Sequence, residues 1–229
     1  NTSVNDIGYF NKITSSDVGD IDGDNKVDIL VNHLVGSSNK LVLLTSSNTL
    51  LQVGAGLYKS KTRMVDINND GKLDIVILGL SSNTTVGAIP KLWIYEYDKS
   101  TSPPSFKFKD ASSDIASLSS ASFDFGDIDK DQDLDLVITG FSASVGLKSI
   151  IYENTTVLGG EFKLTATDNN IVAIKDGTTD LIDFDGDGDL DVVLTGTGAT
   201  SDVFEIYMNK LNENIKNWPR FASGLTAIR

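Results

Sequence analysis

The chain of 229 residues lacks cysteine, which rules out disulfide bonds and thiolate metal sites within it. It contains one histidine, His33, so histidine-dependent acid–base or nucleophilic catalysis has no second imidazole to use. No apolar run approaches the ~18 residues that a membrane-spanning helix requires. These absences argue against a disulfide-stapled domain, a histidine-based enzyme and a helical membrane protein.

Basic residues and glutamate are also scarce. Lys and Arg number 19 against 32 Asp and Glu, giving a formal net charge of −13. Because no basic stripe is present to neutralise phosphates, we do not expect nucleic acid as a partner. Only five acidic residues are Glu, and 17 of the 27 Asp lie in four short segments. The negative charge therefore belongs to those segments rather than to a generally acidic surface.

Those segments share one nine-residue pattern, with Asp or Asn at positions 1, 3 and 5, Asp at position 9, and an apolar run directly after it. We name them loop 1 (20–28), loop 2 (66–74), loop 3 (127–135) and loop 4 (183–191). Loop 4, DFDGDGDLD, is the clearest copy. Carboxylates gathered in one turn repel one another unless a cation lies among them. Oxygen donors without His or Cys suit a hard ion, above all Ca²⁺.

The candidate calcium ligands are the side chains at positions 1, 3, 5 and 9 and the backbone carbonyl at position 7 of each loop. They are Asp20, Asp22, Asp24, Lys26 and Asp28; Asp66, Asn68, Asp70, Lys72 and Asp74; Asp127, Asp129, Asp131, Asp133 and Asp135; and Asp183, Asp185, Asp187, Asp189 and Asp191. We expect up to four structural Ca²⁺ ions, which would bring the net charge from −13 to −5.

Two other interpretations of the loops were considered. An EF-hand requires a bidentate Glu at position 12 and flanking helices, whereas position 12 is apolar in all four copies and strand-like segments flank them. Acidic β-turns without an ion remain the alternative, since Asp, Asn and Gly are common in turns. Position 6 should adopt a left-handed backbone, which suits Gly71 and Gly188 and disfavours Gln132. We therefore expect loop 4 to be the strongest site and loop 3 the weakest.

The loops mark a repeat, because their first Asp residues are spaced by 46, 61 and 56 positions. Each loop has an entry segment before it, and an apolar strand, an alternating strand and a weaker last strand after it. The expected alternating strands are 40–44, 91–97, 149–153 and 203–208, and the expected last strands are 50–53, 106–109, 162–165 and 220–222. Four short strands per unit predict a blade of a β-propeller, whose apolar strand is buried on both faces.

The predicted fold class is therefore all-β, a β-propeller built from four-stranded antiparallel blades. Residues 1–229 form a single propeller region of four repeats, approximately 1–56, 57–112, 113–170 and 171–229. Strand-type segments rich in β-branched and aromatic residues, bounded by Gly, Ser, Asn and Asp, continue through the chain without a change in composition that would separate unlike domains.

The loops and their trailing strands, such as DLVITG, resemble FG-GAP/VCBS repeats, the calcium-binding blades of integrin α-subunit heads and of many bacterial surface proteins. The resemblance covers nearly the whole chain. It implies that each loop links the first two strands of a blade, and that about seven blades form the intact propeller. Four copies fit either part of a larger propeller or a closed ring of four, and we favour the former. No signal peptide precedes Asn1, so we expect a processed product or an excised fragment.

A few further residues are candidates for chemistry outside the loops. We expect His33 and Trp93 to be structural, and Trp218, beside Pro219, to be an exposed contact. Tyr residues that recur on the alternating strands, Tyr95, Tyr152 and Tyr207, are expected to pack rather than to bind a ligand. The sequence patterns at 83–85 and 154–156 match N-glycosylation sites, which matter only in a eukaryotic secretory host.

The clustered Asp residues also invite comparison with a glycosidase pair. Calcium would already occupy those carboxylates, and it opposes the raised pKa that a general acid needs. We therefore expect a non-enzymatic, secreted or cell-surface calcium-binding propeller that acts as a binding or adhesion module for a protein or glycan. The alternative is a carbohydrate-binding propeller, either a lectin or an accessory domain of a polysaccharide-degrading enzyme.

Overall fold

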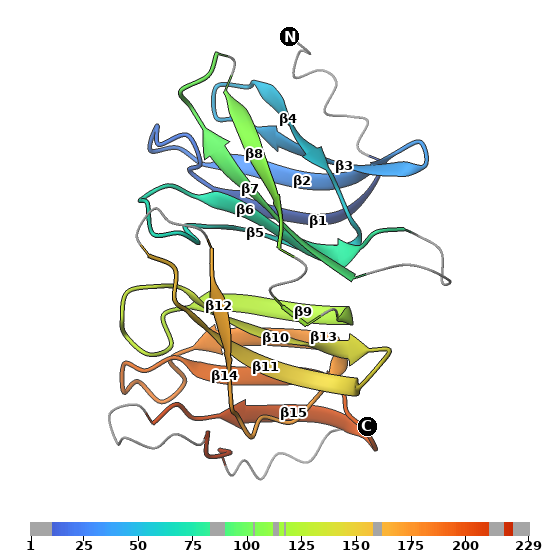
Figure 1. Ribbon diagram of the computed structural model, residues 1–229, viewed down its shortest axis with the longest axis vertical. Coiled ribbons are helices and arrows are strands. Elements are labelled where there is room, and N and C mark those ends of the chain that lie inside the picture. Colours follow the sequence, from blue (N-terminus) through green and yellow to red (C-terminus); the bar gives the residue numbers. More distant parts are fainter. Residues whose placement is uncertain are drawn as a thin grey trace. The chain divides into compact units, whose positions relative to one another are not determined.

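A computed structural model of the chain describes residues 11–82, 90–102, 104–111, 115–116, 118–157, 162–210 and 218–221. These residues contain strands and turns and no helix (Figure 1). The chain divides into two compact units, Asn1–Ser117 and Leu118–Arg229, and each holds two antiparallel sheets.

The first unit contains two four-stranded sheets whose strands follow chain order, β1-β2-β3-β4 and β5-β6-β7-β8. The strands of the first sheet are β1 (Asn11–Gly19), β2 (Asp28–Val35), β3 (Ser38–Leu44) and β4 (Leu50–Ala55). Those of the second are β5 (Tyr58–Val65), β6 (Asp74–Leu80), β7 (Pro90–Asp98) and β8 (Ser105–Asp110). Every neighbouring pair is antiparallel, as expected for consecutive strands joined by short connections.

The second unit contains a four-stranded and a three-stranded sheet, ordered β12-β11-β10-β9 and β13-β14-β15. The strands of the former are β9 (Ser119–Gly126), β10 (Asp135–Ser142), β11 (Gly146–Asn154) and β12 (Leu164–Thr167), and those of the latter are β13 (Lys175–Ile182), β14 (Asp191–Thr197) and β15 (Asp202–Tyr207). The predicted last strand at 220–222 is represented by a single bridge between Tyr207 and Arg220.

These sheets confirm the predicted fold class, an all-β propeller built from antiparallel blades. Each sheet also lies inside one of the four predicted repeats. One strand prediction needs correction: the strand expected at 162–165 is β12, two residues further along. Among the described residues, the fourth blade has three strands and the bridge at Arg220, where its last strand was expected. The apolar strand is buried on both faces in β6 and β10, where six consecutive residues are buried. Strict alternation is lost there because both faces contact protein.

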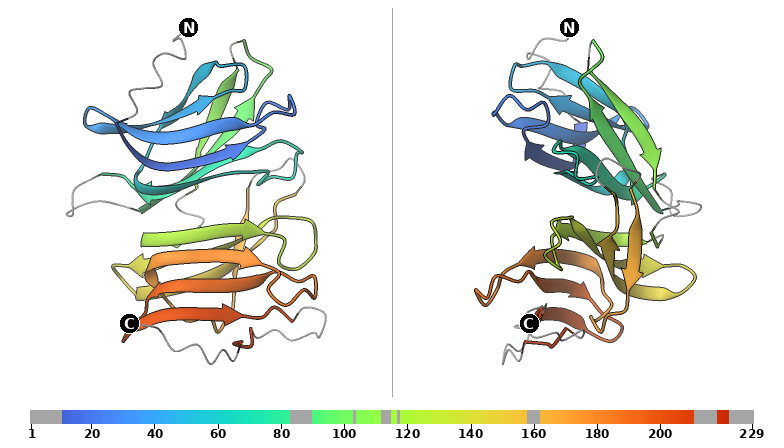
Figure 2. Two further views of the ribbon diagram at one scale, coloured as in Figure 1. Left: turned by 180° about the vertical axis from the view of Figure 1, so that it is seen from behind. Right: turned by 60° about the vertical axis from the view of Figure 1, so that its left-hand side comes forward.

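Within each unit the first strands of the two sheets lie side by side, β1 with β5 and β9 with β13 (Figure 2). The core of the first unit lies between its sheets and includes Leu30, Leu41 and Ile77, each fully or almost fully buried. The core of the second unit includes Val137, Leu194 and Tyr207. Burial of such side chains contributes about 1.5–3 kcal/mol each, so the apolar strands supply much of the stability.

The aromatic predictions are partly correct. Tyr95, Tyr152 and Tyr207 are buried, and Trp93 packs edge-to-face on Phe108 beside the core. Trp218, expected to be exposed, is only 9% exposed and belongs to the core of the second unit.

The physical reason lies in the backbone of Trp218 and its neighbour. Asn170 bonds both the N–H and the carbonyl of Trp218, each at 2.9 Å. The carbonyl of Pro219 accepts the N–H of Met208, also at 2.9 Å. This segment is therefore held along β15, with the indole against the core.

The glycosylation pattern at 154–156 has a structural role instead. Asn154 is buried, and its Nδ2 donates to the carbonyl of Leu134 at 3.1 Å. A glycan on that nitrogen is incompatible with this packing. The pattern at 83–85 lies outside the described residues.

Candidate metal centres

Each acidic loop links the first two strands of its sheet, as the resemblance implied. Loop 1 joins β1 to β2, loop 2 joins β5 to β6, loop 3 joins β9 to β10, and loop 4 joins β13 to β14. The carboxylate at position 1 organises the turn: Asp20 accepts the backbone N–H of Gly23 at 2.8 Å, Asp24 at 3.0 Å and Asn25 at 2.8 Å. The loop therefore folds around its own first side chain, as Asp does in turns.

The same bond from position 6 to position 1 recurs in the other loops. The N–H of Gly71 donates to Asp66 at 2.7 Å, that of Gln132 to Asp127 at 3.2 Å, and that of Gly188 to Asp183 at 3.2 Å. The spacing of the acids therefore produces one backbone conformation four times, independently of the tertiary neighbours.

Two positions of each loop have a left-handed backbone. At position 6 the φ angles run from +63° to +88°, which confirms the prediction for that position. Position 4 is left-handed as well, with φ between +59° and +78°, which the sequence reasoning missed. Loop 4 has glycine at both positions, whereas loop 3 has Lys130 and Gln132. Loop 3 is therefore the most strained copy, since a non-glycine residue in this region is disfavoured by about 1–2 kcal/mol.

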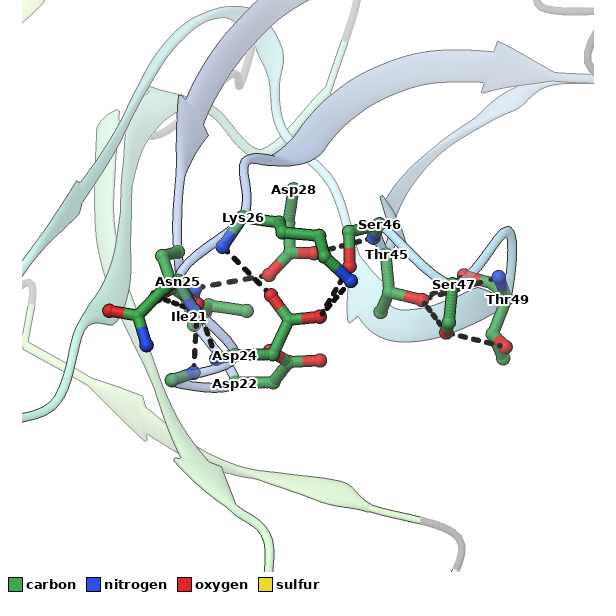
Figure 3. A network of polar contacts seen from close by, with 12 residues as sticks. Ile21, Asp22, Asp24, Asn25, Lys26, Asp28, Thr45, Ser46, Ser47 and Thr49 are labelled. Atoms are coloured by element: carbon green, nitrogen blue, oxygen red, sulfur yellow. Dashed lines mark hydrogen bonds and ion pairs between the residues drawn. The ribbon is translucent and has the colours of Figure 1, made fainter.

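The Asp at position 9 is buried in every loop, with 0%, 3%, 1% and 0% of Asp28, Asp74, Asp135 and Asp191 exposed. One oxygen accepts the N–H of position 2, as in the Ile21–Asp28 bond of 3.1 Å (Figure 3). In loops 1, 3 and 4 the other oxygen accepts an N–H at or just beyond the end of the third strand of the sheet. The donors are Ser46 at 2.8 Å, Asn154 at 2.9 Å and Asn209 at 2.8 Å. This carboxylate thus ties the loop to the sheet.

Positions 1, 3 and 9 converge in three of the loops. Ligand oxygens lie within 4.8 Å of one another in the triads Asp20, Asp22 and Asp28; Asp127, Asp129 and Asp135; and Asp183, Asp185 and Asp191. Loop 2 has Asn68 at position 3 and so offers an amide oxygen in place of one carboxylate. Side-chain oxygens at this separation fit a single hard cation bound at about 2.3–2.6 Å to each.

The electrostatics of the loop carboxylates reflect burial first and neighbouring negative charge second. Burial raises the pKa of Asp74 to about 7 and that of Asp135 to about 6, and it raises the pKa of Asp191 as well. Burial, followed by the neighbouring charge of Asp131, raises the pKa of Asp129. A cation among these carboxylates would favour their ionised forms.

One buried oxygen also fits an ion. Oδ1 of Asp127 is enclosed and has no hydrogen-bond partner among the described residues, although burying an unpartnered carboxylate oxygen is costly. It belongs to the triad of loop 3. The donor set and this oxygen together fit a hard cation.

Position 5 lies outside the triads in the described loops. Asp24, Asp131 and Asp187 each accept the N–H of position 7, at 2.9 Å in all three loops. Asp24 also accepts the hydroxyl of Ser46 at 2.6 Å, which lowers its pKa. That position 5 supplies a ligand, and position 7 a carbonyl ligand, remain predictions.

Lysine side chains form ion pairs with the acidic loops, which we did not predict from the sequence. Lys26 is 3.8 Å from Asp24, Lys72 is 2.8 Å from Asp70, and Lys210 is 3.6 Å from Asp187. Such exposed pairs contribute little on their own. The bonds from Asn154 and Asn209 were also missed, although the repeated strings IYEN and IYMN were a usable signal.

Fold and loops together define a propeller-blade repeat whose acidic loops have the donor geometry of a hard-cation site. Residues 66–138 match the family of FG-GAP-like repeats, which confirms the resemblance suggested by the loops. The match runs from the start of loop 2 into β10. Loops 1 and 4, outside it, have the same backbone and triads.

A comparison with curated proteins found no match for the chain. Within the described residues there is no helix of the length and apolarity needed to cross a membrane.

Proposed function

We propose that this chain is a calcium-stabilised propeller that serves as a binding or adhesion module at the cell surface or in the extracellular medium. The observation that carries the proposal is the repeated convergence of positions 1, 3 and 9 on one point in loops 1, 3 and 4. Calcium is the structural ion: it offsets the clustered carboxylates and joins the first two strands of each blade. We propose no enzymatic activity for the acidic loops, because calcium would occupy their carboxylates.

An oxygen-only donor set in a flexible loop suits Ca²⁺ better than Mg²⁺ or a transition metal. Extracellular modules of this type work at millimolar calcium. That matches a surface or secreted location and a chain that has no disulfide to stabilise it. A protein or glycan on a neighbouring cell or surface is the proposed partner.

A carbohydrate-binding propeller is the second candidate, and one surface feature favours it. Phe184 and Phe221 are 43% and 41% exposed and stack edge-to-face with ring centroids 5.2 Å apart. Position 2 is a buried Ile in loops 1 to 3, namely Ile21, Ile67 and Ile128, so Phe184 is a departure from the repeat. Exposed aromatic rings beside a cation loop suit sugar rings. Trp218, which the sequence suggested as an exposed aromatic contact, is buried and is therefore not available to bind a sugar.

Thermal unfolding with and without calcium tests the proposed role of the ion. An ion that binds only the folded protein stabilises it by RT ln(1 + [L]/Kd) per site, so the melting temperature should rise with calcium and fall in EDTA. Identical melting curves in both conditions would rule the proposal out. A glycan array then separates the candidates: sugar binding that is lost in Phe184→Ala supports the second one.

A further inference from the structure

Lys130 occupies a position where a lysine is unexpected. It is residue 4 of loop 3, with a left-handed φ of +65°, where loops 1 and 4 have Gly23 and Gly186. Asn69, which tolerates this conformation better than most residues, stands there in loop 2. Lysine lacks this tolerance, so the backbone of Lys130 is strained, and a favourable side-chain interaction would offset that strain.

The side chain of Lys130 supplies that interaction by leaving its own loop. Its ammonium pairs with Oδ1 of Asp189, at position 7 of loop 4, in a close contact. The Asp189 side chain is 0% exposed, whereas that of Lys130 is 43% exposed. Burying a charged carboxylate is unfavourable unless it is paired, so the ammonium of Lys130 stabilises the charge that Asp189 buries in loop 4.

The ammonium also lies in the electrostatic field of the loop 4 cluster. The hydrogen bond that Lys130 donates to Asp189 raises the pKa of Lys130, and the charges of Asp189, Asp187 and Asp183 raise it further. The nitrogen is 3.9 Å from the point where a Cβ would lie on Gly188. Lys130 is therefore a positive charge that loop 3 holds beside the candidate cation site of loop 4.

The equivalent positions in the first unit lack the Lys130–Asp189 ion pair. Gly23 and Lys72 stand at the equivalent positions of loops 1 and 2, and both line a cavity of about 210 Å³ between the loops. Neither a lysine at position 4 nor a buried Asp at position 7 occurs there. Lys130 and Asp189 therefore belong together as a feature of the second unit rather than of the repeat.

We propose that Lys130 is a tethered counter-ion that sets the calcium affinity of loop 4. This inference rests on the proposed calcium role. Without calcium, Lys130 neutralises Asp189 and stabilises the loop. With calcium, its positive charge repels the ion and limits the affinity. Removing the ammonium should thus destabilise the calcium-free protein and tighten calcium binding, two effects of opposite sign that a purely structural residue would not produce.

The expected change in affinity follows from Coulomb's law. A unit charge several ångströms from a divalent ion in a water-like dielectric changes the dissociation constant about three- to tenfold. Moderate salt reduces this effect, so low ionic strength is the appropriate condition.

A calcium titration of the whole chain, followed by amide chemical shifts in NMR spectra, measures calcium binding at each loop separately. The N–H of Gly188 reports loop 4, and that of Gly71 reports loop 2 as an internal control. In Lys130→Met, the dissociation constant from Gly188 should fall about three- to tenfold while that from Gly71 stays unchanged. The melting temperature in EDTA should fall. Lys130→Arg, which keeps the charge, should retain the native affinity and stability.

Asp189→Asn provides an independent test, because it leaves the lysine charge uncompensated. It should weaken calcium binding at Gly188, and the double variant Lys130→Met with Asp189→Asn should return the affinity toward the native value. An unchanged or weaker affinity in Lys130→Met, or an Asp189→Asn variant that binds more tightly, would overturn the inference. If calcium moves neither Gly188 nor Gly71, the proposed function itself fails.

Discussion

The carboxylate of Asp17 accepts the backbone N–H of Met64 at 2.6 Å, which joins the first sheet of the first unit to the second. The second unit repeats this bond between Asp124 and Leu181 at 3.0 Å. Both acids stand three residues before their loops, and both donors stand two residues before the next loop. This hydrogen bond therefore recurs at equivalent positions of the two units and joins neighbouring blades within each unit.

A glycine follows each of these acids two residues later and allows the close approach. A Cβ on Gly19 would lie 2.9 Å from Cδ1 of Leu73, and one on Gly126 would lie 2.6 Å from Cδ1 of Leu190. Such contacts are too short for real atoms. In the sequence Asp-x-Gly before a loop, the Asp thus accepts a hydrogen bond from the neighbouring strand. The Gly leaves space for a leucine of the neighbouring loop.

Asp17→Ala should destabilise the chain by about 1–3 kcal/mol, because it leaves the N–H of Met64 without its partner between packed sheets. Asp17→Asn keeps an acceptor and should cost less. Urea unfolding measures both. Asp180→Ala is the matched control: Asp180 has the same place relative to loop 4, and its side chain makes no hydrogen bond to any residue that the structure describes. Equal losses in Asp17→Ala and Asp180→Ala would contradict the role of the bond.

Gln132→Gly should stabilise the chain, because Gln132 has a φ of +78° that glycine adopts without strain. We expect a gain of about 0.5–1 kcal/mol, since the greater freedom of glycine in the unfolded chain offsets part of the relief. The reverse change in loop 2, Gly71→Gln, should destabilise: no atom lies within 4 Å of a Cβ there, so only the backbone is affected. Thermal unfolding of the two variants in saturating calcium should move in opposite directions, and a parallel shift would be evidence against backbone strain.

Calcium should stabilise the protein more than magnesium does at the same concentration. Mg²⁺ requires a tight octahedral shell and loses its water reluctantly, whereas the loop carboxylates offer a looser set of oxygens. Melting curves at matched millimolar concentrations and constant ionic strength provide the measurement. Equal shifts with both ions would mean that the loops respond to general charge screening.

Asp187→Ala should be more damaging than Asp131→Ala in saturating calcium. Both remove the position 5 acid, but loop 4 has glycine at both left-handed positions, and loop 3 has none there. We expect a loss of about 1–3 kcal/mol for Asp187→Ala and less for Asp131→Ala. In EDTA the difference should shrink, because neither loop then holds an ion. A larger loss for Asp131→Ala would reverse our order of the two sites.

The local part of this structure was accessible from the sequence alone. Acids at positions 1, 3 and 5 bond N–H groups two to five residues away, so the spacing itself dictates the turn. The apolar run after each loop then predicts a buried strand, and four such units predict propeller blades. The strand expected at 162–165 was misplaced by two residues because β12 lies at a sheet edge, where hydrophobic patterning is weak.

The partners of each loop were decided by tertiary structure. Asp17 and Met64 are separated by 47 residues along the chain, and Lys130 reaches Asp189 in the next repeat. No periodicity records such pairs, because they depend on which sheets pack together and on the space that Gly19 and Gly126 leave. Trp218 shows the same limit: its place beside Pro219 in an expected loop predicted exposure, yet its two backbone hydrogen bonds with Asn170 hold it against the core. The sequence by itself determined the short-range hydrogen bonds within each loop. Packing of the sheets decided which residues far apart in the sequence form hydrogen bonds and ion pairs.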